Sequence, residues 1–450
     1  MTVQTETTTR PLATAVDKPN PISIRRAPTK MVVGIDVGTT KVCSIAGFRK
    51  DDGGFQILAH SAVPCNGLSK GNVSDIDSTS DAIRKSVQSL QEAIGFKIES
   101  AYVGVTGSDI AFENRRDDLD PISGHGVITA EDLDREPKAL AETIYEPGRQ
   151  LIHALRMTYS VEGEDGIRNP IGMHSNTIEV DTHMVTAATV FVDKLATAVE
   201  QAGVSVTGMV LEPMASGLAV MTPAERIRGT VLVDIGGGTT DVVGFQQGRV
   251  CFTGVIPIGG FQFTNDIAVT YNTTHEAAEN VKLAHASTDI PRFGNDVSLP
   301  VTGSDVGLRV EIAEICQLVR ERANELARLI KIKLDESDIE GLSRYKIVLT
   351  GGSSNLPGIA ELIQRSLAVA VRRGVPGGRD GFPDELRNPR YATAVGILQW
   401  AAEQGLPKTD APAPSIERKQ GGRRGLVAGL VKQISRLAPR AYFAAKKGRN

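Results

Sequence analysis

Two short segments combine an aspartate, glycines and threonines in the same order. The first is Val33–Lys41 and the second is Val231–Asp241. In each, a β-branched apolar run ends in aspartate and is followed by glycine, two hydroxyl residues and a second apolar run, which predicts a strand that turns tightly into another strand. Glycines at such a turn let successive backbone N–H groups approach phosphate oxygens, and hydroxyls and a lysine add further donors. The repeated pattern predicts two loops that clamp one phosphate chain.

The candidate phosphate-binding residues belong to these two turns. They are Gly38, Thr39, Thr40, Lys41, Gly236, Gly237, Gly238, Thr239 and Thr240. The two aspartates that precede the turns, Asp36 and Asp234, are expected to meet across the phosphates, where a Mg²⁺ ion held through water neutralises the charge. A single turn of this kind is more often an ordinary hairpin connection, so the prediction depends on the pair.

A third glycine-rich segment, Lys346–Gly358, is a strand that runs into a glycine pair, a polar turn and the start of a helix. A glycine pair leaves a flat backbone surface that suits an adenine ring. The residues expected to contact the adenosine part of a nucleotide are Gly351, Gly352, Ser353 and Asn355.

In this order, the three segments resemble the nucleotide-binding loops of the actin-like ATPase superfamily, and the resemblance spans most of the chain. It implies an α/β, actin-like two-lobe fold with duplicated ribonuclease H-like sheets, and ATP with Mg²⁺ as cofactors. Two segments, Glu212–Gly217 and Tyr391–Gly396, resemble the superfamily's two connecting helices. Small residues at those positions let two helices cross closely, so these segments are interpreted as a hinge between the lobes.

The stretch after the second phosphate loop resembles the bacterial cell-division FtsA family. The similar segments are Thr253–Gly260, Thr264–Ala268, Ala278–Lys282 and Asn388–Leu398. This resemblance implies that Glu279 and Lys282 face the ribose and adenine, and their spacing of three places both on one helix face. An exposed ion pair between the two is the alternative interpretation.

Periodicity, composition and the FtsA resemblance together predict the domain organisation, including an FtsA-type inserted subdomain. The expected parts are a disordered N-terminal tail (1-29), the first lobe (30-101 and 183-228), the inserted subdomain (102-182), the second lobe (229-264 and 344-402), its helical subdomain (265-343), a flexible linker (403-422), and an amphipathic membrane-targeting helix with a basic tail (423-450).

Composition limits the other classes of function. The net charge of −3 argues against general nucleic-acid binding. The 4 cysteines lack C-x-x-C spacing, and the 7 histidines form no ligand cluster, so neither a zinc site nor a disulfide framework is expected. No apolar run approaches the roughly 20 residues needed to span a bilayer, so membrane attachment is expected to be peripheral.

The C-terminal segment separates apolar and basic residues onto two faces of one helix. Ten lysines and arginines accompany one acidic residue between Glu417 and Asn450. Such a helix lies in the plane of a bilayer and meets anionic headgroups with its basic face, and the FtsA family ends in such a linker and helix. Docking of the helix on its own domain is the alternative. The expected membrane-binding residues are Leu426, Val427, Leu430, Val431, Ile434, Leu437, Lys432 and Arg436.

The FtsA resemblance implies an ATP-binding actin homologue that polymerises at the division site, on the cytoplasmic face of the cell membrane, and anchors FtsZ filaments there. The implied partners are FtsZ, further copies of the chain, an anionic membrane surface and other division proteins that contact the inserted subdomain. Glu212 takes the position of a glutamate near the attacking water in the superfamily's heat-shock chaperones. A helix-capping or hinge role for Glu212 is the alternative, and ATP hydrolysis stays open.

Two other functions are compatible with the nucleotide-binding loops. A pilus-assembly adaptor of the PilM type shares the loops and the inserted subdomain, but the basic C-terminal helix disfavours it. A small-molecule kinase of the same superfamily needs a further carboxylate base in a substrate cleft, and no carbohydrate motif is present.

Overall fold

The computed structural model describes most of the chain between residues 31 and 404. The described residues are 31–50, 54–119, 126–134, 146–292, 295–304, 307–337, 339, 341–377 and 382–404. The predicted N-terminal tail and the predicted membrane-targeting helix with its eight membrane-binding residues lie outside these ranges, as does the linker beyond residue 404. Within the described part of the chain, none of the helices has the length and apolar character required to cross a bilayer.

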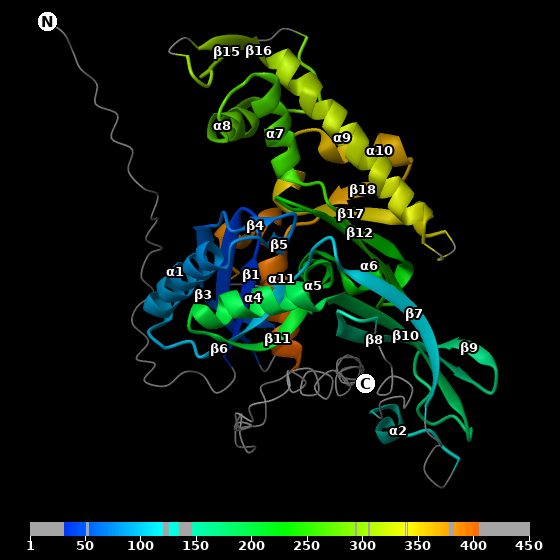
Figure 1. The fold of residues 1–450 in the computed structure, drawn as a ribbon. Coiled ribbons are helices and arrows are strands. Elements are labelled where there is room, and N and C mark those ends of the chain that lie inside the picture. The colour runs from blue at the N-terminus through cyan, green and yellow to red at the C-terminus, as the bar shows by residue number, and fades with distance from the viewer. Residues whose placement is uncertain are drawn as a thin grey trace, which may run out of the picture.

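The first lobe is a five-stranded sheet with helices on both faces (Figure 1). The strand order is β11 (Ser205–Leu211), β6 (Ser100–Val105), β1 (Val32–Val37), β2 (Lys41–Arg49) and β3 (Phe55–Pro64). Helices α1 (Ile76–Ile94) and α4 (Thr189–Gln201) enclose a core with one face of the sheet, and a short hairpin of β4 (Leu68–Ser69) and β5 (Asn72–Val73) precedes α1. The Asp75 side chain caps α1 by accepting from the Ser78 N–H, and Gly95 ends it in a left-handed conformation.

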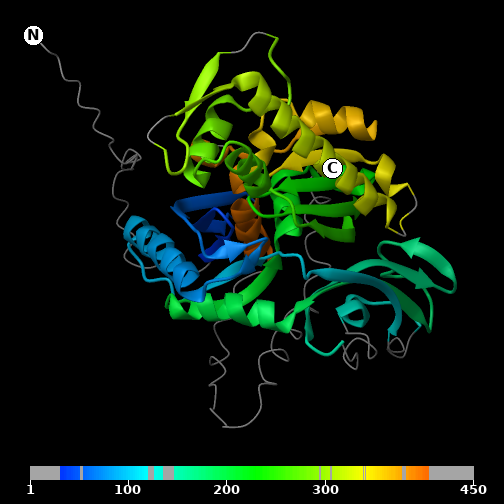
Figure 2. The same cartoon turned by 45° about the horizontal axis from the view of Figure 1, so that its top comes forward.

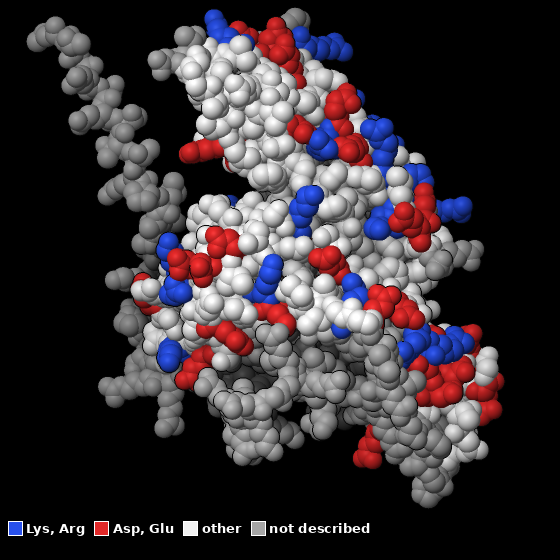
Figure 3. Space-filling model, in the orientation of Figure 1, with Lys and Arg blue, Asp and Glu red and all other residues white. Residues whose placement is uncertain are grey.

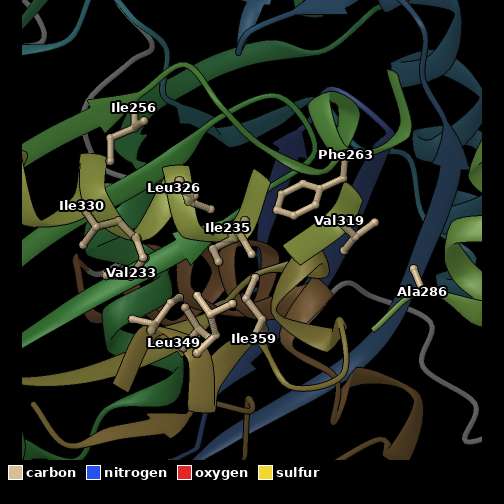
Figure 4. Close-up of a cluster of buried hydrophobic side chains, with 14 of the residues drawn as sticks. Val233, Ile235, Ile256, Phe263, Ala286, Val319, Leu326, Ile330, Leu349 and Ile359 are labelled. Atoms are coloured by element: carbon tan, nitrogen blue, oxygen red, sulfur yellow. The ribbon is translucent and has the colours of Figure 1, made fainter. Parts of the chain in front are cut away.

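The second lobe repeats this plan. Its sheet has the order β14 (Arg249–Ile256), β13 (Thr240–Gln246), β12 (Thr230–Ile235), β17 (Lys346–Thr350) and β18 (Val371–Arg373), and the helices around it are α6 (Pro223–Arg228), α7 (Gly260–Thr270), α8 (His275–His285), α9 (Ile312–Asp335) and α10 (Ile359–Leu367). In Figure 4, Val233 and Ile235 of β12 lie in one buried cluster with Phe263 of α7 and Leu326 of α9. Burial of these side chains holds the helices on the sheet.

The helical subdomain of the second lobe contains α7, α8 and α9 with a small hairpin. The hairpin strands are β15 (Asp296–Leu299) and β16 (Leu308–Glu311). Helix α7 begins at Gly260 rather than at the expected 265, because the Gln262 side chain accepts a hydrogen bond from the Gly259 N–H and caps the helix there. Both signs of charge line the edge along α9 in Figure 3, and Arg322 of α9 binds both oxygens of Asp266 at 2.6 and 2.7 Å.

Two helices cross between the lobes, α5 (Glu212–Val220) and α11 (Ala392–Gln404). A methyl group at Gly396 of α11 would lie 1.8 Å from the carbonyl oxygen of Ala215 in α5. Only glycine permits this approach, so the prediction that small residues let these helices cross closely is confirmed. Together with parts of both sheets, the two helices form a third core between the lobes.

The inserted subdomain is a four-stranded antiparallel sheet. Its strand order is β7 (Ala111–Leu119), β10 (Ile178–Ala188), β8 (Arg149–Val161) and β9 (Glu164–Ile167), and a short helix α2 (Ala130–Asp134) accompanies it. Both boundaries differ from the expected 102-182. The parallel pairing of β6 with β11 continues to Val105, which keeps 102–105 in the first lobe. The pairing of β10 with β8 continues to Ala188, which assigns 183–188 to the insert instead of the first lobe.

The insert also contacts the second lobe, as Figure 2 shows where its strands lie beside the second-lobe sheet. His183 of β10 is fully buried and bridges Asn114 of β7 and Thr253 of β14, with Nδ1 2.6 Å from Asn114 Oδ1 and Nε2 2.9 Å from Thr253 Oγ1. The Asn114 side chain also donates to the carbonyl of Cys251 at 3.0 Å. This network fixes the insert to the edge strand of the second lobe.

Acid is expected to weaken the fold through His183. Burial lowers the pKa of His183 to about 3, whereas an unfolded histidine titrates near 6.5. Below pH 6.5 the unfolded chain therefore binds a proton that the folded chain does not, and the free energy of unfolding decreases as the pH is lowered. At pH 5 this decrease is about 2 kcal/mol. Urea unfolding at pH 7 and pH 5 checks this: His183→Gln, which cannot titrate, should lose less stability than the wild type. An equal loss in both proteins would contradict it.

Candidate nucleotide-binding site

The two predicted phosphate loops are hairpins of equivalent geometry. In the first, Val37 pairs with Val42 and the Gly38 N–H donates to the Lys41 carbonyl at 3.0 Å. In the second, Ile235 pairs with Thr240 and the Gly236 N–H donates to the Thr239 carbonyl at 2.9 Å. The two similar sequences thus form similar turns, one in each lobe.

These turns face each other across the junction of the lobes. A methyl group at Gly237 would lie 2.6 Å from Thr40 Cγ2, and one at Gly238 would lie 2.5 Å from Thr39 Oγ1. Both distances are shorter than a real Cβ contact, so a side chain at either glycine would displace a threonine of the first loop. The structure therefore brings together glycines and threonines of both loops, as predicted from the sequence.

Peptide orientation in the second loop is set by the start of α7. The N–H groups of Gly260 and Phe261 donate to the carbonyls of Gly236 and Gly237 at 2.9 and 2.7 Å, and the Ser353 hydroxyl donates to Gly236 as well. Because the C=O and N–H of one trans peptide point in opposite directions, the N–H groups of Gly237 and Gly238 face away from α7, which suits an anion. Thr240 departs from the prediction, because its buried hydroxyl donates to the Ile258 carbonyl at 2.7 Å and its proton is committed to the fold.

Four buried carboxylates gather behind the loops. Lys41 Nζ lies 3.1 Å from Asp36 Oδ2 in the first lobe. In the second lobe, Asp234 Oδ2 accepts from Ser216 of α5 at 2.6 Å and from Thr393 of α11 at 3.4 Å. The other two carboxylates are those of Asp241 and Glu212. The site is therefore strongly acidic, and both crossing helices contribute to it.

The electrostatics of this cluster raise the pKa of three carboxyl groups. Burial raises the pKa of Asp234 to about 6 and that of Asp241 to about 7. Burial and then the negative charges of Asp36, Asp241 and Asp234 hold the pKa of Glu212 well above its usual range. The cluster has more negative charge than its own residues neutralise, which is the condition that a divalent cation relieves.

The donor set fits a hydrated cation. Among the described residues, no group of three or more histidine, cysteine, aspartate or glutamate side chains is arranged to ligate a metal ion directly. Asp36 and Asp234 each use one oxygen in a hydrogen bond to the chain, to Lys41 and to Ser216. Oxygen ligands and retained water are what Mg²⁺ prefers, so these two aspartates suit contacts through water.

The segments expected to hold adenosine meet at the start of α7. Lys282 of α8 donates to Glu279 at 2.7 Å, to Thr264 at 2.8 Å and to the Gly260 carbonyl at 3.2 Å, so the pair that share a helix face form an anchored ion pair rather than an exposed one. Gly351 has a φ of 87°, and a methyl group there would lie 2.2 Å from Asp234 Oδ1. The third loop is thereby packed directly on the second.

Polar contacts extend the third loop toward the start of α11. The turn after Gly351 is a 3-10 helix, η2 (Gly352–Asn355). Asn355 donates to Asn388 Oδ1 at 3.1 Å and accepts from Arg373 at 2.5 Å. These contacts place Asn355 beside η4 (Pro389–Tyr391), whose Tyr391 ring lies 5.4 Å from the Lys41 ammonium.

Several residues of the site were not predicted from the sequence. The Thr106 hydroxyl donates to Asp241 Oδ1 at 2.6 Å and so links the first lobe to the second. Ser216 and Thr393 hold Asp234, and they lie in the two small-residue helix segments that the sequence did single out. Lys70 lies next to the second loop, with its Cα 3.3 Å from a methyl group placed at Gly238. Only its neighbour Gly71, which marks a turn, gave a local signal.

The chain resembles known proteins over most of its length. A family model described as "Cell division protein FtsA" matches residues 231–396, and one described as "SHS2 domain inserted in FTSA" matches residues 107–186. The cell division protein FtsA of Pseudomonas aeruginosa is 33% identical over 384 residues, which are 83% of this chain and 90% of that protein. That of Bacillus subtilis is 32% identical over 375 residues, 83% of each chain.

A solved structure, that of a PilM–PilN type IV pilus biogenesis complex, superposes with a TM-score of 0.58 at 17% identity and covers 82% of this chain and 98% of that one. At this identity the likeness concerns the fold alone. The expected α/β, actin-like two-lobe fold with an FtsA-type insert is confirmed by the two repeated sheets and the matched insert. From the family models and the extent of its identity with the curated relatives, the chain belongs to the FtsA family of cell division proteins.

Proposed function

We propose that this chain binds Mg²⁺–ATP between its lobes, assembles into filaments on the cytoplasmic face of the cell membrane at the division site, and holds FtsZ polymers there. The observation that supports nucleotide binding most is the pair of facing glycine-threonine turns with buried carboxylates behind them. Membership of the FtsA family supports the role in division.

Each part of the nucleotide has matching residues. Backbone N–H groups of Thr39 and Thr40 in the first turn and of Gly237–Thr239 in the second would hold the phosphates, since the Gly38 and Gly236 N–H groups close the turns, and Lys41 would add a cation. Asp36 and Asp234 would hold Mg²⁺ through water, and the ion would supply charge neutralisation for the phosphates. Glu279 and Lys282, with the third loop from Gly351 to Asn355, would hold the adenosine.

Slow turnover is part of the proposal. Glu212 is the candidate for orienting an attacking water, and it begins α5 next to Gly104, where a methyl group would lie 2.9 Å from its Oε1. Burial and neighbouring carboxylates raise its pKa, so a larger fraction of this carboxyl group is protonated at neutral pH than in an exposed glutamate, and a smaller fraction is available to accept a proton from water. We therefore infer that ATP acts as a switch more than as a rapidly consumed substrate.

The crossing helices supply a route from nucleotide to assembly. Ser216 of α5 and Thr393 of α11 both bond to Asp234, so a change at this carboxylate shifts the helices that join the lobes. A ligand that binds the closed arrangement of the lobes more tightly than the open one shifts the equilibrium toward the closed arrangement by the difference between the two binding free energies. Closure then sets the surfaces that join subunits. Many weak terminal helices on one filament then give firm attachment to the membrane.

Co-sedimentation with anionic liposomes and FtsZ, with and without ATP, tests the proposal. Full-length protein should carry FtsZ into the pellet, and a chain truncated after Gln420 should not. Leu430→Glu, on the apolar face of the terminal helix, should behave like the truncation, whereas Gln433→Glu adds the same charge on the polar face and should retain most binding. If the truncated chain sediments with liposomes as well as the full-length chain does, the terminal helix is not the anchor. If the full-length chain sediments with liposomes but leaves FtsZ in the supernatant, the link to FtsZ is refuted.

A further inference from the structure

The short hairpin β4–β5 connects the first phosphate loop with the second. At its base, the Cys65 N–H donates to the carbonyl of Thr40 in the first loop at 3.1 Å. The N–H groups of Ser74 and Asp75 both donate to the Gly67 carbonyl, at 2.9 and 3.1 Å, which closes the hairpin and ties it to the start of α1. In Figure 1 the hairpin lies at the junction of the two lobes. Its base is therefore fixed to the first lobe.

The tip of the hairpin, Lys70–Gly71, contacts the second phosphate loop. The Cα of Lys70 lies 3.3 Å from a methyl group placed at Gly238, and a methyl group at Gly71 would lie 3.3 Å from Thr239 Cγ2. The Lys70 side chain is exposed. Since the lysine stem is long and flexible, its ammonium group is able to extend to an anion held by the Gly238 turn.

Backbone geometry at the tip is costly for lysine. Lys70 and Gly71 have φ values of 50° and 78°, the left-handed pair of a two-residue hairpin, where Asn-Gly is the favoured sequence. Glu162–Gly163 and Gln247–Gly248 form turns with the same signs of φ, so the strain alone does not distinguish Lys70. What distinguishes this tip is its position: a cation is presented beside a glycine-rich loop that faces buried carboxylates.

The same tip packs on the root of the inserted subdomain. A methyl group at Gly71 would lie 3.0 Å from the Cα of Gly107, which has a φ of 143° and follows the last residues of β6. Beside it, Asn72 donates to Asp109 Oδ2 at 3.2 Å, and Arg149 of β8 donates to the Asp109 carbonyl at 2.9 Å. A shift of the tip would therefore displace the segment through which the chain enters the insert.

We propose that the Lys70–Gly71 tip is a third phosphate-binding element, in which Lys70 binds the terminal phosphates of the nucleotide and the accompanying movement of the tip is passed through Gly107 and Asp109 to the insert. This inference rests on the proposed nucleotide binding. It assigns Lys70 a binding role, and it gives the nucleotide state a direct path to the insert that does not run through the crossing helices.

Lys70→Asn is the decisive variant, because asparagine suits the left-handed turn and removes only the cation. With Mg²⁺ present, calorimetric titration should show ATP binding weakened about tenfold in Lys70→Asn, and AMP binding unchanged. Lys70→Arg should stay within about threefold of the wild type. Gln247→Asn, the same kind of change in a distant turn, should bind ATP as the wild type does.

The rate of amide hydrogen exchange in residues 107–119 measures whether nucleotide binding at the tip affects the insert. Addition of Mg²⁺–ATP should slow exchange there in the wild type and in Gln247→Asn, and saturating Mg²⁺–ATP should leave it unchanged in Lys70→Asn. If the wild type binds ATP and Lys70→Asn binds it equally well, or if the insert responds equally in both, the proposal is overturned. If the wild type binds no ATP, the proposed function itself fails.

Discussion

Replacement of Gly396 by alanine is expected to destabilise the protein by about 3 kcal/mol, one of the largest effects of any single methyl group in this chain. The added carbon would lie 1.8 Å from the Ala215 carbonyl oxygen and 2.2 Å from its carbonyl carbon. Both are backbone atoms in the middle of α5, so no side-chain rotation relieves the overlap. The helices must separate, and the core between the lobes opens with them.

Urea unfolding followed by circular dichroism measures this effect. Gly377→Ala is the matched control, because a methyl group there would meet no atom of the described residues within 4 Å. The control should unfold at the same urea concentration as the wild type or slightly above it. Coincident unfolding curves for Gly396→Ala and Gly377→Ala would show that α5 and α11 are free to move apart.

The same overlap predicts an effect on the site. Asp234 is held by Ser216 of α5 and Thr393 of α11, and these two hydroxyls lie 3.0 Å apart. Separation of the helices lengthens at least one of these bonds. Nucleotide binding by Gly396→Ala should therefore be weakened even under conditions in which the variant remains folded.

The parts of the site that local sequence determines were predictable. Each phosphate turn is specified by a short run of residues, as in Gly236–Thr239. The glycines and the flanking β-branched residues determine the backbone conformation of that run. The spacing of Glu279 and Lys282 likewise predicts a shared helix face, and the two form an ion pair. In both cases the residues that define the feature are neighbours in the chain.

Features that depend on distant pairing were not predictable. The limits of the insert follow from how far β6 and β10 continue to pair, and no local signal marks Val105 or Ala188. The bond from Thr106 to Asp241 joins residues of different lobes. Thr240 matches the motif, yet its hydroxyl donates to Ile258 because the chain returns past it at the end of β14. Sequence pattern identifies hydroxyls, whereas only packing decides what they bind.

Removal of the Lys41 charge is the second change for which a large effect is expected. Lys41→Met should cost about 3 kcal/mol, because it leaves the Asp36 carboxylate buried without its partner, among three further carboxylates. Burial is the largest single influence and acts to lower the pKa of Lys41, but the attraction of Asp36, the charge of Cys43 and the hydrogen bond to Asp36 together outweigh it, and the pKa is raised. The ammonium group is therefore charged at neutral pH, and its loss is a loss of charge compensation.

A double-variant cycle separates charge compensation from simple packing. Asp36→Asn with Lys41→Met replaces the pair by uncharged groups of similar size and should recover a large part of the lost stability, since no carboxylate is then left alone at that position. Additive losses in the double variant would contradict the pairing. Mg²⁺ should also stabilise Lys41→Met more than the wild type, because loss of the ammonium group leaves one more negative charge uncompensated for a divalent cation to neutralise. If Mg²⁺ shifts the urea midpoint of both proteins equally, the acidic cluster is not where the cation binds.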